Sequence, residues 1–400
     1  MGYQGVLNHN MHPFPRDTRI DVFCSLALLT IFINHIPGTL YEYITHKKFG
    51  FSDSAEIFVL LSGISLELSF HVRLYQESFN FIRRKLWRRA LQLYRAYLFT
   101  TSATLSLFIG TFLLWHTEKI LAINNVGFFF TKPFIAFFST LSFWHQLGYN
   151  NILPLYIVLM LFAPFALYLS GKHKGLLLWG LLLWGLLLWG LLLWGLLLWG
   201  LFILYLICGF YKIASPSYPL QGKWFLNSWS WQFLFVLGLI AALPLKQGKT
   251  IIFQLFLVVL SAIYLLFSLL WVRLNWWGVL GWLGWSSPLI NFNKTFLSLP
   301  RLLHVVALSS LTLCWPRLHK WFSVSEKHPL AILGKQSLPV FVIGMLFAMF
   351  GKVLKTVMTG TFFSDSCLII SGITMQFGDT CYCEKRRFLQ RSFLRKPVSL

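Results

Sequence analysis

Apolar runs long enough to cross a lipid bilayer recur along the chain, and they constrain its fold more than any other feature. About twenty mostly apolar residues form one membrane-spanning helix. Ten such runs are predicted, with approximate bounds 20–36, 55–72, 90–114, 151–170, 176–210, 229–245, 250–272, 302–316, 337–357 and 361–378. The chain is 57% apolar and 12% charged, which excludes an ordinary soluble domain. The sequence therefore predicts an all-α, polytopic integral membrane protein with about ten transmembrane helices.

The distribution of Lys and Arg predicts the orientation of these helices. The formal net charge is +22, but no water-soluble basic module that would bind nucleic acid is visible. Basic residues concentrate in the loop 71–89 and in the tail 379–400, and cytoplasmic loops of membrane proteins are rich in Lys and Arg. Both termini are therefore predicted to be cytoplasmic. The expected organisation is a cytoplasmic N-terminus (1–19) without a cleavable signal peptide, a ten-span domain (20–378) and a basic cytoplasmic tail.

Two connecting segments and one internal repeat do not match a plain span. The segment 116–150 mixes charged and aromatic residues, and 275–301 is rich in Trp and Gly, so both are interpreted as interfacial or re-entrant. Leu-Leu-Leu-Trp-Gly occurs five times in 176–200. A five-residue step turns a helix by about 140°, so the tryptophans form no single face. The repeat is interpreted as a spacer within one long span, and a glycine-mediated helix contact is the alternative.

The six cysteines do not have the spacing of a zinc site. Cys381 and Cys383 stand together in the basic tail without a second pair of ligands, and most of the others lie in or beside apolar runs. The sequence therefore predicts free thiols and no bound metal.

His35 is the candidate catalytic base. It follows Asn34 at the end of the first predicted span, and Pro37-Gly38 interrupt the run behind it. An ionisable group at membrane depth is expensive and usually faces a cavity, and a neutral imidazole accepts and returns a proton near neutral pH. The alternative is a histidine whose ring is satisfied by a helix carbonyl.

Asp53 and Glu56 open the second predicted span and lie three residues apart, so they share a helix face. One interpretation is that they pair with His35 or with a basic group and tune its pKa, which makes them candidate catalytic residues. The other is that they cap the helix and complement its dipole.

Amide, aromatic and basic side chains gather near the predicted outer ends of later spans. Aromatic rings stack on sugars and amides bind their hydroxyls, whereas basic groups engage an acidic acyl group or snorkel to the interface. Interfacial anchoring is the alternative for the aromatic residues. The candidate substrate-binding residues are Asn151, Tyr156, Trp231, Gln232, Lys294, Arg301 and His304.

A basic cluster precedes the third span on the predicted cytoplasmic side. It contains Arg83, Arg84, Lys85, Arg88 and Arg89. Such clusters set topology and bind anionic lipid. Arginines also bind phosphate bidentately, so the cluster is compatible with a polyanionic donor such as coenzyme A. These residues alone are compatible with transmembrane acyl transfer to a sugar and equally with a transporter.

Eight sequence blocks, in order from about Arg16 to about Val357, resemble one family. They are RDTRID, INHIPG, FGFSDSAEIFVLLSG, WHQLGYNNILPLY, WSWQFLFVLG, NFNKTF, PRLLH and LGKQSLPVF. They are similar to the OpgC-type osmoregulated periplasmic glucan succinyltransferases, within the acyltransferase-3-like membrane acyltransferases. The resemblance implies transfer of succinyl or a similar acyl group from cytoplasmic acyl-CoA (succinyl-CoA) to hydroxyls of a periplasmic glucan. It also implies the bacterial inner membrane and no bound cofactor.

The resemblance assigns roles to residues of the first span. His35 matches the family histidine, but Cys24 stands where the family has an arginine. A thiol does not replace that positive charge, and Arg19 is the candidate substitute, so Arg19, Arg83, Arg84 and Arg88 are the expected donor-binding set. The principal hypothesis is a membrane O-acyltransferase. The alternatives are a glycan or lipid transporter and an inactive relative that lacks the arginine.

Overall fold

The structure is a computed structural model. It describes residues 17–116, 126–180, 186–218, 222–246, 255–279, 287, 289–315, 320–357 and 361–394. Almost all secondary structure in these residues is helical. The two described strands, β1 (Pro216–Ser217) and β2 (Gly222–Lys223), form one short antiparallel ladder. The predicted all-α class is therefore confirmed.

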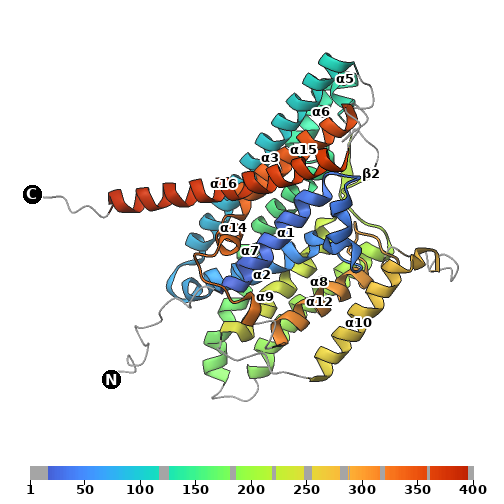
Figure 1. The fold of residues 1–400 in the computed structure, drawn as a ribbon. Helices are drawn as coiled ribbons and strands as arrows, with labels where there is room; N and C mark the ends of the chain where they lie inside the picture. Colours follow the sequence, from blue (N-terminus) through green and yellow to red (C-terminus); the bar gives the residue numbers. More distant parts are fainter. Residues whose placement is uncertain are drawn as a thin grey trace, which may run out of the picture.

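Long helices make up the bundle, and shorter helices connect them (Figure 1). The long helices are α1 (Thr18–Asn34), α2 (Ser54–Gln76), α3 (Phe79–Trp115), α7 (Ile152–Gly180), α8 (Leu186–Phe210), α9 (Ser228–Lys246), α10 (Leu255–Arg273), α12 (Leu299–Cys314), α15 (Ser337–Val357) and α16 (Phe362–Leu394). The short ones are η1 (Leu40–Ile44), η2 (His46–Lys48), α5 (Phe128–Thr131), α6 (Pro133–Leu141), η4 (Gly148–Asn151), η5 (Trp276–Gly278) and α14 (Pro329–Lys335).

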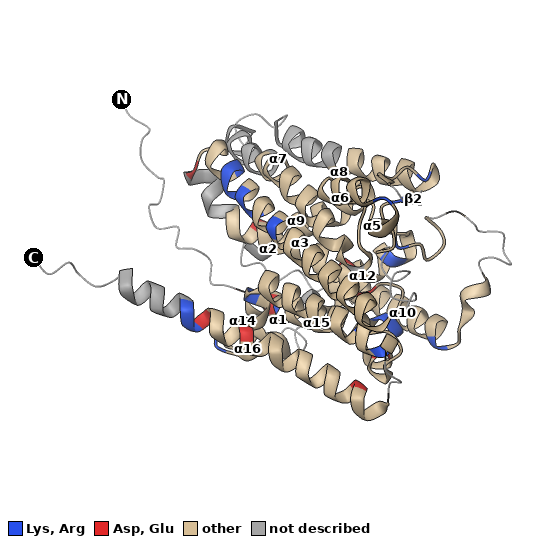
Figure 2. Ribbon diagram, turned by 90° about the horizontal axis from the view of Figure 1, so that it is seen from above, with Lys and Arg blue, Asp and Glu red and all other residues tan. Residues whose placement is uncertain are grey.

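Three described helices are long and apolar enough to cross a bilayer, namely α3, α10 and α15, and shorter apolar stretches lie in α7, α8, α9 and α12. On α10 the side chains of Phe256, Ile263 and Leu266 are 74%, 60% and 57% exposed. Such a surface suits lipid and not water. Lys and Arg lie mainly toward the helix ends (Figure 2). The chain is thus consistent with a membrane protein, while the number of about ten spans stays a prediction.

Several predicted boundaries differ from the observed helices. Helix α3 begins at Phe79 and not near residue 90, because Ser78 caps it by accepting a hydrogen bond from the Phe81 amide and the basic residues that follow are good helix formers. Helix α16 continues past residue 378 to Leu394, into the predicted tail. The run 176–210 is divided, since 176–180 complete α7 and a separate helix, α8, begins at Leu186. The side chains of most of the repeat lie outside the described residues.

Helix α2 packs closely against α9, and this contact fixes the position of α2 in the bundle. A Cβ atom at Gly63 would lie 2.2 Å from the carbonyl oxygen of Phe235, and one at Gly238 would lie 2.2 Å from the carbonyl oxygen of Leu60. Each glycine therefore lets the partner backbone approach. Helices α1 and α2 lie in the middle of the bundle (Figure 1), and the end of one and the start of the other form the site described next.

Candidate functional site

A cavity of about 760 Å³ opens where α1 ends and α2 begins. We call it the His35 cavity. Its lining comes mainly from the end of α1, the segment from η2 to the start of α2, η4, and the segment that leads into α12. The segment before α9, the end of α10, η5 and α15 also contribute. The polar and aromatic lining residues are Asn34, His35, Lys47, Lys48, Phe51, Ser52, Asp53, Ser54, Asn151, Phe225, Asn275, Trp277, Lys294, Arg301 and Phe341. Of the fourteen predicted site residues, the structure places His35, Asp53, Asn151, Lys294 and Arg301 together here.

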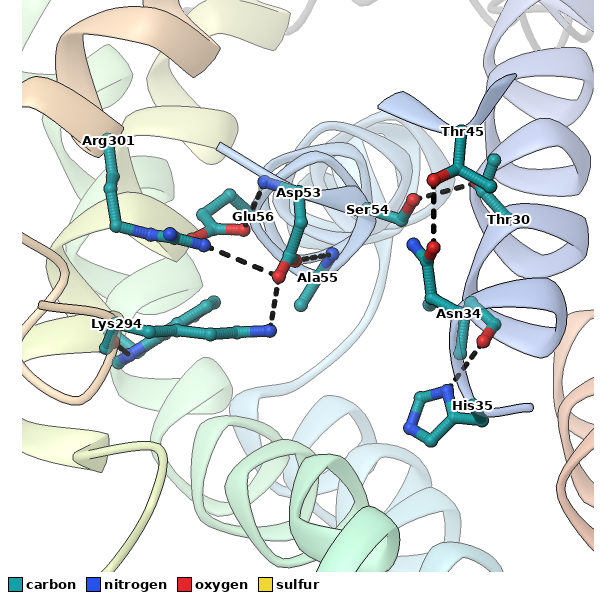
Figure 3. A network of polar contacts seen from close by, with 12 residues as sticks. Thr30, Asn34, His35, Thr45, Asp53, Ser54, Ala55, Glu56, Lys294 and Arg301 are labelled. Carbon is teal, nitrogen blue, oxygen red and sulfur yellow. Dashed lines mark hydrogen bonds and ion pairs between the residues drawn. The ribbon is translucent and has the colours of Figure 1, made fainter. Parts of the chain in front are cut away.

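The imidazole of His35 is held in one tautomer. Its Nδ1 lies 2.5 Å from the carbonyl oxygen of Ile31, one helical turn earlier (Figure 3). A carbonyl only accepts, so Nδ1 carries the proton and donates it, and the lone pair of the neutral ring is on Nε2. The interpretation that a helix carbonyl satisfies the ring is therefore met at Nδ1. The ring also lines the cavity, and its role as a base stays a prediction.

The turn behind His35 is held from two other helices. Gly38 has φ +77°, a conformation that favours glycine. Its carbonyl oxygen accepts a hydrogen bond from Lys355 Nζ of α15 at 3.1 Å, and the same ammonium pairs with Asp365 of α16 at 2.9 Å. The Gly38 amide donates to Glu42 at 2.8 Å. Sequence reasoning missed Lys355 and Asp365, since nothing in a single sequence connects them to a turn more than three hundred residues away.

Asp53 and Glu56 form a reciprocal cap at the start of α2. The Asp53 carboxylate accepts from the Ala55 amide at 2.9 Å, and the Glu56 carboxylate accepts from the Asp53 amide at 3.0 Å. The capping interpretation is therefore confirmed.

The same two carboxylates bind the two basic residues from the other side of the cavity (Figure 3). Arg301 lies 2.6 Å from Glu56 and 3.3 Å from Asp53, and Lys294 contacts Asp53 directly. Burial raises the pKa of Asp53, but the positive charges of Lys294 and Arg301 outweigh it and hold that pKa well below its ordinary value. Asp53 is thus ionised at neutral pH. The expected pairing of the carboxylates with a basic group is met by Lys294 and Arg301.

His304 supports the loop before α2 instead of lining the cavity. It is 2% exposed, and its Nδ1 lies 2.7 Å from the hydroxyl of Ser52. A Cβ atom at Gly50 would lie 1.8 Å from its Nε2, so the ring fills the space beside a glycine. The ring centroids of His304 and its neighbour His46 are 5.6 Å apart. Burial lowers the pKa of His46 to about 4, so His46 is neutral at physiological pH.

The predicted sugar-binding residues divide into three groups. Asn151 lines the His35 cavity, and its side-chain oxygen is buried without a hydrogen-bond partner among the described residues. Trp231 is fully buried and donates from Nε1 to the carbonyls of Lys294 and Thr295, at 3.2 and 3.3 Å. Gln232 donates to the carbonyl of Trp229 in the same helix, α9. Tyr156 lies elsewhere. Phe225 and Trp277, which line the cavity, were not singled out from the sequence.

Tyr156 belongs to a second cavity of about 330 Å³, which we call the Cys24 cavity. Its hydroxyl lies 2.8 Å from that of Ser62. Lys85 and Arg89 of α3 line this cavity together with Cys24.

The four arginines expected to bind a donor line neither cavity. Arg19 pairs with its neighbour Asp17 at 2.5 Å. Arg83 stacks on the rings of Trp87 and Phe79. Arg84 and Arg88 are exposed on α3.

The free-thiol prediction is consistent with the structure where it describes the side chains, and the absence of a bound metal stays a prediction. None of the five cysteines with described side chains forms a disulfide, and the side chain of Cys314 is not described. No group of three or more His, Cys, Asp or Glu is arranged for a metal ion within the described residues.

One protein-family model matches nearly the whole chain. The family model described as OpgC protein matches residues 16–387, which include both cavities. No curated protein and no solved structure matches the chain. Because the family model covers nearly the whole sequence, the chain belongs to the OpgC family, and membership implies a transferase that takes part in the modification of periplasmic glucans.

Proposed function

We propose that this protein is a membrane O-acyltransferase that moves a succinyl or similar acyl group from a cytoplasmic acyl-CoA to a hydroxyl of a periplasmic glucan. The observation that carries the proposal is the state of His35. Its Nδ1–H is held by the Ile31 carbonyl, and its ring lines a cavity of about 760 Å³. This arrangement leaves Nε2 as the basic atom of a neutral ring, which a general base at neutral pH requires.

In the proposed reaction, His35 Nε2 accepts the proton of the glucan hydroxyl as the oxygen attacks the thioester carbonyl. The new C–O bond forms, the C–S bond breaks, and the proton passes from His35 to the departing thiolate. Asn151 and Trp277 line the same cavity, and an amide and an indole suit the hydroxyls and the apolar face of a sugar.

Lys294 and Arg301 are proposed to stabilise the oxyanion that forms on the acyl carbon. Their side chains line the His35 cavity, and Asp53 and Glu56 hold both cations in place. Arginine has five N–H donors, so the carboxylates leave some for a substrate. Preorganised donors of this kind typically contribute about a hundredfold to a thousandfold in rate. Asp53 and Glu56 then position the cations.

The departure at Cys24 is compatible with activity. The position that carries an arginine in similar sequences faces the Cys24 cavity, and that cavity is also lined by Lys85 and Arg89. These two cations are four residues apart and share one face of α3. We propose that they supply the positive charge there, in place of Arg19, which is turned toward Asp17.

Mass spectra of periplasmic glucans test the proposal. Cells that lack their own glucan acylation would express the unaltered chain, His35→Gln, Cys24→Arg, or the exposed-site control His116→Asn. Gln retains a donor for the Ile31 carbonyl but no titratable nitrogen. Acyl additions with the unaltered chain and the control, and none with His35→Gln, support the enzyme. Acyl additions only with Cys24→Arg would identify an inactive relative. Bare glucans in every case, with protein in the membrane, would reject the proposal in favour of transport or another acceptor.

A further inference from the structure

The two cavities lie one after the other along α1. Cys24 lines the smaller cavity and His35 lines the larger one. They are eleven residues apart on one helix, which places them about 16 Å apart along the axis. That distance is about half the apolar thickness of a bilayer, which is about 30 Å.

One pair of side chains lies between the cavities. Ile152, the first residue of α7, and Phe341 of α15 line both of them. Both are apolar and nearly buried, at 7% and 5% exposed. Because each side chain contacts both spaces, the wall at this point is a single layer of side chains from two different helices.

The lining of the Cys24 cavity suits a long, flexible thioester with a phosphorylated end. Lys85, Arg89 and Lys335 are cations of the kind that phosphate binds. Of these, Lys335 also lies 3.7 Å from the Glu384 carboxylate. The paired hydroxyls of Ser62 and Tyr156 suit amide groups in a connecting arm. The lining also includes the carboxylate of Asp21 and three further serines, and its apolar part includes Phe58, Leu66, Phe70 and Met160.

We propose that the acyl-thioester arm of the donor occupies the Cys24 cavity and presents its acyl end to His35 between Ile152 and Phe341. This inference rests on the proposed function, and it adds the route by which the thioester reaches the acceptor. The acyl group is transferred directly, so no covalent acyl-protein forms. The thiolate that leaves, after it takes the proton from His35, is still attached to the arm in the Cys24 cavity.

Protection of Cys24 from alkylation tests occupancy of the cavity independently of transfer. In a variant whose other five cysteines are Ser, inverted membrane vesicles would be treated with N-ethylmaleimide, with and without succinyl-CoA. Modification of Cys24 would be followed by mass spectrometry. Saturating succinyl-CoA is expected to slow it at least tenfold, whereas succinate alone does not. Equal rates with and without succinyl-CoA would overturn the proposed site.

A bulky residue in the wall tests the route. Ile152→Trp and, separately, Phe341→Trp are expected to lower glucan acylation at least tenfold while succinyl-CoA still protects Cys24, which also shows that the variant is folded. The matched control is Leu161→Trp, at an exposed position of α7, the helix that contains Ile152. Unchanged acylation in both wall variants would overturn the route. If succinyl-CoA protects Cys24 in the protein with unaltered Ile152 and Phe341 but that protein acylates no glucan, the donor site is retained and the proposed function is rejected.

Discussion

Neutralising Glu56 is expected to destabilise the fold, because it breaks a buried ion pair from one side. The Glu56 side chain is fully buried, and Arg301 is 12% exposed with a contact of 2.6 Å between them. Removing one partner of such a pair typically costs about 3–5 kcal/mol, since the other charge stays buried. Asp53 remains 3.3 Å from Arg301, so we expect the lower end, about 3 kcal/mol.

The substitution to use is Glu56→Gln. Glutamine serves in a capping box as well as glutamate does, so the measured loss reports the charge and not the helix cap. Unfolding would be followed in mixed detergent micelles by titration with dodecyl sulfate. The matched control is Glu326→Gln, at an exposed position, which should stay within about 0.5 kcal/mol of the unaltered protein.

A double-mutant cycle separates the ion pair from simple damage to the fold. Glu56→Gln with Arg301→Gln removes both charges, so the pair should be less destabilised than the sum of the single variants, by at least about 1 kcal/mol. Additive effects, or a loss below about 0.5 kcal/mol for Glu56→Gln alone, would refute the reasoning.

Two further predictions concern stability. The folded pKa of His46, about 4, lies below its ordinary value of 6.5. Between these values the unfolded chain therefore binds more protons at this residue than the folded chain does. The free energy of unfolding falls as the pH falls through that window, by about 2 kcal/mol at pH 5. His46→Gln should flatten the dependence of unfolding free energy on pH between 7.5 and 5; an unchanged slope would contradict this. Gly63→Ala places a Cβ 2.2 Å from the Phe235 carbonyl, whereas at Gly110 nothing lies within 4 Å. Gly63→Ala should cost more than about 2 kcal/mol and Gly110→Ala nothing, and equal melting temperatures would contradict the close packing of α2 on α9.

The helices around the site follow from local sequence. The first apolar run and the Pro37-Gly38 break predict the end of α1 to within a few residues, and the spacing of Asp53 and Glu56 predicts the cap of α2. These features depend only on neighbours in the chain, which is why a single sequence contains them.

Long-range contacts were beyond prediction from a single sequence. Asp53 and Glu56 were expected to pair with His35 or with a basic group, but the sequence did not identify Lys294 and Arg301 as their partners. The order of spans along the chain does not reveal which helices are neighbours in space. The same holds for Lys355 on the carbonyl of Gly38.

Spacing along the chain does not by itself place some of the site residues. Asn151 ends η4 and Tyr156 lies within α7, so the two residues are on different elements, and their side chains face different cavities. In the basic cluster, Lys85 and Arg89 share one face at a spacing of four. Arg84 and Arg88 have the same spacing on another face, so the spacing alone does not identify which pair lines the cavity.

The initial rate of acyl transfer by the purified protein in liposomes tests the central claim most directly. Succinyl-CoA is supplied on one side and glucan on the other, and the unaltered protein is compared with His35→Gln and His116→Asn. General base catalysis typically contributes about a hundredfold to ten-thousandfold. We expect a loss of at least about a hundredfold for His35→Gln and an unchanged rate for His116→Asn. A full rate in His35→Gln would contradict the claim, because the transfer would then need no base at this position.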